Sequence, residues 1–171
     1  SNCITVTVND VTGGTVAADQ TVCSGGDPAA FTVSVASTGS GTLSYQWQSN
    51  TTSCAAAFTN IAGATGATYD APSGLTVTTY YRRVTTSTLN TVACTANSNC
   101  ITVTVNDVTG GTVAADQTIC SGGDPAAFTV TVASTGSGTL SYQWQSNTTS
   151  CAAAFTNIVG ATGATYDAPS G

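Results

Sequence analysis

Residues 41–50 read GTLSYQWQSN and alternate between apolar and polar side chains. Leu43, Tyr45 and Trp47 fall on one side of this stretch, and serine and glutamine residues fall on the other. A period of two predicts a β-strand with one buried face. Because three large side chains share that face, we expect Trp47 to lie in a hydrophobic core. A sugar-stacking platform, formed by Trp47 and its copy Trp144, is the alternative interpretation.

Similar short segments follow one another along the chain, separated by clusters of Gly, Ser, Asp and Pro. Thr and Val, which favour strands, are abundant, whereas strong helix formers such as Glu, Lys and Met are absent. About seven strands with regular turn signals are typical of an immunoglobulin-like β-sandwich, so the sequence predicts an all-β fold of this class. The expected strands are 15–22, 29–37, 42–49, 58–62, 67–71, 77–87 and 100–106.

The chain is an internal repeat. Residues 1–74 align with residues 98–171 at a constant offset of 97, and the two copies differ only at Val22/Ile119, Ser34/Thr131 and Ala62/Val159. A period of this length corresponds to one small domain rather than to a solenoid unit. We therefore expect tandem immunoglobulin-like domains, with a complete domain at 11–107 and the N-terminal part of a second at 108–171. Residues 1–10 are then the terminal strand of a preceding or partner unit.

Seven cysteines are present, and one full period contains four of them. The chain has no His and no C-x-x-C pair, which argues against zinc sites and against a Cys–His nucleophile. Disulfides in an oxidising, extracellular setting are the expected role. Pairing at the same end of the sandwich predicts the bonds Cys23–Cys54, Cys94–Cys100 and Cys120–Cys151, with Cys3 unpaired. The rival pairing predicts Cys3–Cys23, Cys100–Cys120 and Cys54–Cys94.

The composition excludes several classes of function. A net charge of −6 with only two cations, Arg82 and Arg83, is incompatible with neutralising a phosphate backbone, so no nucleic-acid binding is expected. No apolar run is long enough for membrane insertion. Without His, Lys or Glu, the chain lacks the usual acids and bases of catalysis, and we expect it not to be an enzyme. Its Asp residues stand singly in turn motifs, so no metal or other cofactor is predicted.

The two arginines are neighbours on one predicted strand, so their side chains point to opposite faces. One of them must therefore lie toward the interior, where it needs a carboxylate or several carbonyl groups. Asp70 is the expected carboxylate.

Two copies of an N-x-T tripeptide make Asn50 and Asn147 possible glycan acceptors, and the dense Thr and Ser surface offers further attachment sites for covalent glycans.

The motifs YQWQ, GATGATY and TTYYRRV, together with SNCITVTVN, resemble the tandem immunoglobulin-like repeats of large surface proteins in Bacteroidota-type bacteria. The resemblance covers essentially the whole chain. It implies a secreted, cell-surface location and a non-catalytic structural role in a stalk or filament. An adhesin repeat that binds a glycan or protein ligand is the alternative.

The leading stretch CITVTVND is identical to residues 100–107, which are expected to complete the intact domain. It can therefore add to the incomplete second domain of an identical chain, with Ile4, Val6 and Val8 in the places of Ile101, Val103 and Val105. Such contacts would propagate a head-to-tail fibre. The plainer expectation is that the ends mark where a continuous array was cut.

Overall fold

The computed structural model describes residues 1–170, which fold as two compact units: unit 1, Ser1–Asn106, and unit 2, residues 107–170. The described residues contain strands and no helix, which confirms the prediction of an all-β fold. Unit 1 contains β1 (Thr15–Val16), β2 (Gln20–Cys23), β3 (Val33–Val35), β4 (Thr42–Asn50), β5 (Thr59–Asn60), β6 (Thr79–Leu89), β7 (Val92–Asn97) and β8 (Ile101–Asn106). Unit 2 contains β9 (Val108–Thr109), β10 (Thr112–Val113), β11 (Val130–Val132), β12 (Thr135–Gly136), β13 (Gln145–Ser146) and β14 (Thr156–Asn157).

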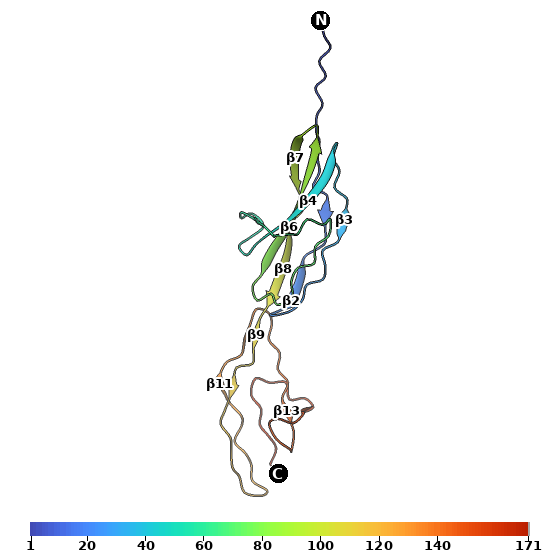
Figure 1. Cartoon of the computed structure of the whole chain (residues 1–171). Helices are drawn as coiled ribbons and strands as arrows, with labels where there is room; N and C mark the ends of the chain where they lie inside the picture. Colours follow the sequence, from blue (N-terminus) through green and yellow to red (C-terminus); the bar gives the residue numbers. More distant parts are fainter. Residues whose placement is uncertain (171) are drawn as a thin grey trace. The chain divides into compact units, whose positions relative to one another are not determined.

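The larger sheet of unit 1 has the strand order β2-β8-β6-β4-β5 (Figure 1). Its longest strands, β4 and β6, run antiparallel over nine paired residues. The β2–β8 pair is parallel, whereas the other pairs are antiparallel. The central strand of the sheet is β6, whose sequence TYYRRVTTSTL is rich in Thr and Tyr, residues that favour strands.

Two strands share one edge of β6. The second half of β6 forms a hairpin with β7, and its first half pairs with β8. The hairpin turns at Asn90 and Thr91, which have φ angles of 48° and 69°, in the left-handed region used by two-residue turns. Between β7 and β8 the register with β6 shifts by one residue, which is the signature of a β-bulge. The bulge lies opposite Arg83, whose backbone bonds to Ser98.

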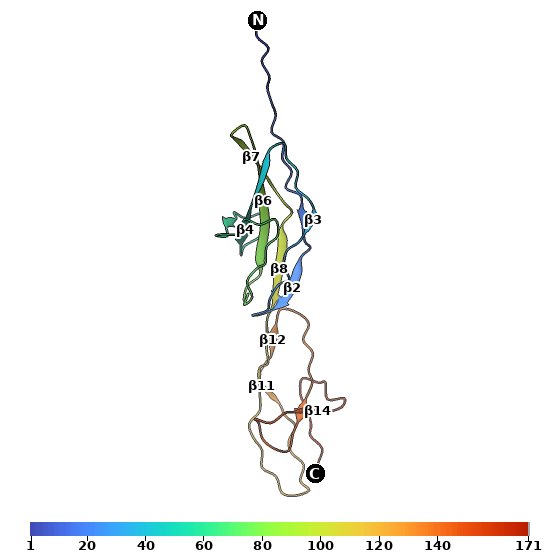
Figure 2. The same ribbon diagram turned by 45° about the vertical axis from the view of Figure 1, so that its right-hand side comes forward.

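A second layer consists of the β1–β3 pair and a bridge between Phe31 and Tyr69. Both views show β3 standing apart from β6 (Figures 1 and 2). The core contains Val16 from the small layer and Trp47, Tyr81, Ile101 and Val103 from the large sheet. These residues come from both layers, so the core lies between them.

The inner face of β6 divides into two halves of different polarity. Tyr81 joins the apolar core, whereas Arg83, Thr85 and Ser87 are polar and yet at most 1% exposed. An apolar core and a polar interior network therefore lie end to end beneath one strand. Because a buried polar group is costly unless it is hydrogen-bonded, this half of the interior depends on its bonding partners.

Several strand predictions agree with the structure only approximately. β4 and β8 lie within a residue of their expected bounds, and β6 is displaced by two residues from 77–87. The segment 67–71 forms only the bridge at Tyr69, and 15–22 is divided between β1 and β2. β7 was not predicted, since VACTAN lacks a clear alternation and becomes a strand only through pairing with β6.

Unit 2 repeats the local turns and short pairs of unit 1 but has no large sheet. Residues 107–170 correspond to residues 10–73 and therefore include no counterpart of β6, β7 or β8. The counterpart of β2, residues 117–120, is also not a strand, because β2 pairs only with β8 in unit 1. One face of this unit consequently remains open.

Candidate functional site

One disulfide is formed among the described residues. Cys54 and Cys100 are joined with a Cα–Cα distance of 5.8 Å. Cys54 lies in the loop after β4, and Cys100 lies in the bulge before β8. Both pairings expected from the sequence are therefore wrong for these two cysteines. The bulge, which sequence reasoning did not find, brings Cys100 to the β4 loop rather than to the opposite end of the unit.

The remaining cysteines are free thiols in this structure: Cys3, Cys23, Cys94, Cys120 and Cys151. By the 97-residue offset, Cys151 corresponds to Cys54, and Cys3 corresponds to Cys100. Both Cys3 and Cys151 are exposed. Cys3 and Cys151 are therefore the copies of the two cysteines that form the disulfide of unit 1.

Arg83 is the arginine that lies inside, with 1% of its surface exposed. Its Nη1 donates to the Ala67 carbonyl at 2.7 Å, and its Nη2 donates to Ser37 Oγ at 2.6 Å and to the Gly13 carbonyl at 3.2 Å. The guanidinium carbon lies 4.6 Å from the centre of the Tyr45 ring, a cation–π arrangement. Asp70 is not its partner, so the expected carboxylate is replaced by carbonyl and hydroxyl oxygens.

These partners explain how the positive charge of Arg83 is buried without a carboxylate beside it. Burial lowers the pKa of the Arg83 guanidinium, and the nearby Tyr45 partly opposes that effect. Carbonyl dipoles and the face of an aromatic ring stabilise a cation without adding a carboxylate that would need its own desolvation. Arg82, on the other face of β6, instead stacks over Phe58 at 4.3 Å and donates to Gln48 Oε1 at 2.8 Å.

Trp47 is a core residue, as the alternation of residues 41–50 predicted. It is fully buried, its ring lies 5.7 Å from that of Phe31 and 5.6 Å from that of Tyr69, and its Nε1 donates to the Gly66 carbonyl. Tyr81 completes this aromatic cluster, and burial raises its pKa. In unit 1 the Trp47 ring therefore offers no platform for a sugar.

Asn9 fastens the start of the chain to unit 1. Its Nδ2 donates to the carbonyls of Ser87 at 2.7 Å and Val92 at 2.9 Å, and its Oδ1 accepts from Ser87 Oγ at 2.8 Å. The backbone N–H of Asp10 donates to Ser40 Oγ, and the Asp10 carbonyl accepts from the Ser40 N–H. Residues 1–8, by contrast, form no strand, and Ile4, Val6 and Val8 are 86%, 84% and 77% exposed.

The open face of unit 2 exposes side chains whose copies form the core of unit 1. Val113 is 49% exposed, whereas Val16 is 2% exposed, and Trp144 is half-buried, whereas Trp47 is fully buried. Two cavities adjoin this face. Cavity A, of about 180 Å³, is lined by Gly110, Ser134, Tyr142, Trp144 and Ala164, together with four Thr and Val residues and Gln143. Cavity B, of about 610 Å³, is lined by residues 113–117 with Ile119, Pro125, Phe128, Trp144 and Gln145.

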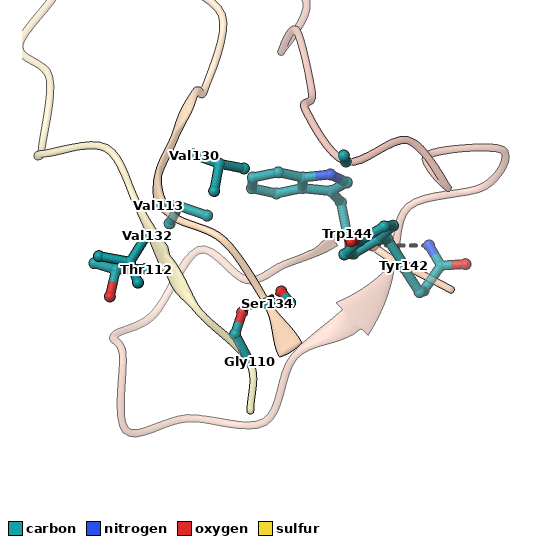
Figure 3. A pocket seen from close by; sticks show the side chains of 10 residues that line it. Gly110, Thr112, Val113, Val130, Val132, Ser134, Tyr142 and Trp144 are labelled. Carbon is teal, nitrogen blue, oxygen red and sulfur yellow. Dashed lines mark hydrogen bonds between the residues drawn. The ribbon is translucent and has the colours of Figure 1, made fainter. Parts of the chain in front are cut away.

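Figure 3 shows cavity A, with the Trp144 ring directed toward Val113 and Val130 and with Gly110 and Ser134 lower in the view. Cavity B includes residues 117 and 119, which correspond to the strand β2 that pairs with β8 in unit 1. Its lining also includes Trp144 and Gln145, whose copies Trp47 and Gln48 pair with β6. Cavity B therefore lies where β8 and β6 pack in unit 1.

The two possible glycan acceptors lie in tight loops. Asn50 Oδ1 accepts from the backbone N–H groups of Thr52 and Ser53, and Asn147 Oδ1 accepts from those of Thr149 and Ser150. Both side chains are half-buried. Their glycosylation stays a prediction.

Within residues 1–170, no group of three or more Cys, Asp, Glu or His side chains is placed to hold a metal ion. The same residues contain no helix of the length and hydrophobicity needed to cross a bilayer.

Comparison with known proteins gives a family but no named relative. No curated protein and no solved structure matches the chain. The sequence matches one family twice, over residues 12–107 and again over residues 109–170. These two matches follow the internal repeat and together cover most of the chain. The protein therefore belongs to the family described as "Domain of unknown function (DUF8696)".

Proposed function

We propose that this protein is a structural, non-catalytic repeat of an extracellular bacterial surface stalk or filament, and that identical chains assemble head-to-tail by strand donation. The observation that carries the proposal is a contrast in burial between identical sequences. Ile101, Val103 and Val105 are at most 7% exposed in β8, whereas their copies Ile4, Val6 and Val8 are largely exposed.

Each unit is proposed to be an immunoglobulin-like sandwich, complete in unit 1. Three features support this assignment. Two layers enclose one core, and a Trp is buried on the long strand β4. The edge strand β2 runs parallel to β8, the last strand of the unit. A secreted location is supported by the Cys54–Cys100 bond, since such bonds persist in oxidising compartments.

Strand donation places residues 1–8 of one chain in cavity B of another. The donated strand runs parallel to residues 117–120, as β8 runs parallel to β2. The donated strand would then make the contacts that β8 makes in unit 1, each between residues whose numbers differ by 97 from those in the β8 contact or in its partner. The Thr102 N–H donates to Asp19 Oδ1 at 2.7 Å in unit 1, so the Thr5 N–H would donate to Asp116 of the neighbouring chain. Three buried apolar side chains and a new strand pairing provide the driving force.

The same alignment brings Cys3 of one chain beside Cys151 of the next, in the places of Cys100 and Cys54. Oxidation of the two thiols forms one S–S bond and releases two protons and two electrons. A small-molecule disulfide such as oxidised glutathione accepts them and becomes two thiols. The fibre would then be linked covalently along its length.

A glycan-binding or protein-binding adhesin repeat is the alternative. It requires an exposed aromatic cluster in every repeat, and in unit 1 the cluster of Phe31, Trp47 and Tyr69 is largely buried. The burial of that cluster favours the structural role.

The test follows assembly and cross-linking of the chain in a glutathione redox buffer. Cleavage before Asp residues yields residues 1–9, which contain only Cys3, and residues 124–166, which contain only Cys151. We expect oligomers by light scattering, a ladder of covalent species on a non-reducing gel, and these two peptides joined in the digest. Mixing ¹⁴N-labelled and ¹⁵N-labelled chains identifies bonds between different molecules.

Matched variants separate donation from nonspecific association. Val6→Asp places a charge at a buried position of the donated strand, whereas Thr7→Asp places it at a position whose copy, Thr104, is exposed. Assembly should be lost in the first variant and kept in the second. Equal behaviour of the two variants, or a chain that stays monomeric at high concentration, would refute strand donation. Assembly without the Cys3–Cys151 peptide would refute only the covalent link.

A further inference from the structure

The chain enters and leaves unit 1 at opposite ends of its central strand. At the entry, Asn9 donates to the carbonyl of Ser87, near the hairpin end of β6. At the exit, β8 pairs with the first residues of β6, and the Val105 N–H donates to Thr78 Oγ1 just before that strand begins. The eight steps from Thr79 to Ser87 span about 26 Å. A pull on the two ends of unit 1 therefore acts along its strands, with β7 at one end and β2 and β8 at the other (Figure 2).

β8 is held along both of its edges in this geometry. Four of its residues pair in parallel with β2, and three pair antiparallel with β6. The inner side chains of β8, at Ile101, Val103 and Val105, are at most 7% exposed. Because the hydrogen bonds of a sheet run across the strands, a lengthwise pull on β8 loads these bonds and contacts together rather than one after another.

Two further hydrogen bonds hold the ends of the β2–β8 pair. Before β2 begins, Asp19 Oδ1 accepts from the Thr102 N–H at 2.7 Å. After β2 ends, the Ser24 N–H donates to the Asn106 carbonyl at 3.0 Å. The first of these bonds has an ionised acceptor, which makes it stronger than a bond between neutral groups.

The disulfide gives tension a short covalent route through unit 1. Cys100 directly precedes β8, and Cys54 lies in the loop after β4. The bond therefore closes a loop between residues 46 apart, and this loop contains β5, β6 and β7. Once β8 is pulled away, the force that reaches Cys100 crosses the S–S bond to Cys54, so the chain between the two cysteines carries no load.

From these observations we propose that unit 1 is a tension-bearing element whose extended length is set by the redox state of one bond. Shear of β8 against β2 and β6 resists the pull, and the Cys54–Cys100 bond keeps β5, β6 and β7 outside the stretched part of the chain. The inference rests on the proposed role in a stalk or filament, because the subunits of such a structure are pulled from their two ends.

Reduction of the bond changes the length that unit 1 can release. A dithiol reductant gives up two protons and two electrons and becomes a disulfide, while Cys54 and Cys100 become thiols. The 46 residues between them then join the stretched chain. At about 3.5 Å for each extended residue, this adds about 160 Å to the extension.

Single-molecule stretching of the 171-residue chain between two handle domains tests the covalent route. We expect the total extension to be about 160 Å longer after treatment with dithiothreitol, and the difference comes from unit 1 because Cys120 and Cys151 of unit 2 are free thiols. Cys54→Ser should give the long extension without reductant. Cys94→Ser, which replaces a free thiol inside the loop, should keep the short one. Equal extensions of the oxidised and reduced chains would overturn the proposal.

A second pair of variants tests the shear of β8. Asp19→Ala removes the charged hydrogen bond to Thr102, so we expect it to unfold roughly 10-fold faster at constant force. Asp27→Ala, at an exposed position after β2, removes the same charge and should change the rate by less than about 2-fold. Equal rates in the two variants would also overturn the proposal. Because both measurements use single chains, neither result depends on head-to-tail assembly, which light scattering and cross-linking test separately.

Discussion

Replacing Arg83 by Met should destabilise unit 1 far more than the same change at Arg82. The two substitutions remove the same charge and add the same side chain at adjacent positions of β6. Arg83 is 1% exposed and makes three hydrogen bonds and one cation–π contact, whereas Arg82 is half-buried and makes one of each. Comparing the two variants therefore isolates the effect of the buried polar network.

The magnitude follows from the groups left without partners. The Gly13 carbonyl still accepts from Ser37 Oγ, but the Ala67 carbonyl loses the donor that it has in unit 1. A hydrogen bond to a charged group contributes about 1.5–3 kcal/mol, and an orphaned buried acceptor costs about 1–3 kcal/mol. Relief of guanidinium desolvation offsets part of the loss. We expect a net loss of about 3 kcal/mol for Arg83→Met and of at most about 1 kcal/mol for Arg82→Met.

Urea unfolding monitored by Trp47 fluorescence provides the assay, in a Trp144→Phe background so that only unit 1 is observed. With a slope of about 1.5 kcal/mol per molar urea, the Arg83 variant should unfold at a midpoint lower by about 2 M. The Arg82 variant should shift by less than about 0.7 M. Equal shifts in the two variants, or an Arg83→Met protein more stable than the wild type, would refute the reasoning that carbonyl partners make this buried charge stabilising.

Reduction of the Cys54–Cys100 bond, which joins residues 46 apart, should lower the free energy of unfolding of unit 1 by about 4 kcal/mol, and thermal unfolding with and without reductant measures this loss. Asn9→Ala should cost about 2 kcal/mol by leaving two carbonyls unpaired, whereas Asn2→Ala, at an exposed position, should leave the unfolding temperature unchanged in the same assay. Burial raises the pKa of Tyr81, so the folded state holds the phenol proton more tightly than the unfolded state does. The stability that this protonated phenol contributes is complete below pH 10 and is lost as the pH rises further. Absorbance of tyrosinate should therefore show the ionisation of Tyr81 only as unit 1 unfolds. Trypsin, whose only sites follow the two arginines of central strand β6, should cleave the native protein slowly and the reduced, unfolded chain fast; rapid native cleavage would mean that this strand is frayed.

Local patterns in the sequence were sufficient for the all-β class, for most of the long strands and for the burial of Trp47. Alternation with period two reports which side chains share a face, and it does so without knowledge of the partner strand. The internal repeat was equally visible, and with it the correspondence between residues 4–9 and β8. These properties depend on neighbours in the chain, so the sequence by itself determined them.

The tertiary structure decided which groups distant in sequence meet. β7 exists because β6 offers it an edge, and the one-residue bulge before β8 directs Cys100 to Cys54 and Ser98 to Arg83. The alternation of apolar and polar residues does not predict such a bulge, because the bulge arises where the β6–β7 pairing gives way to the β6–β8 pairing. The partners of Arg83 are backbone carbonyls, which every residue has, so no residue type could identify them before the chain was folded.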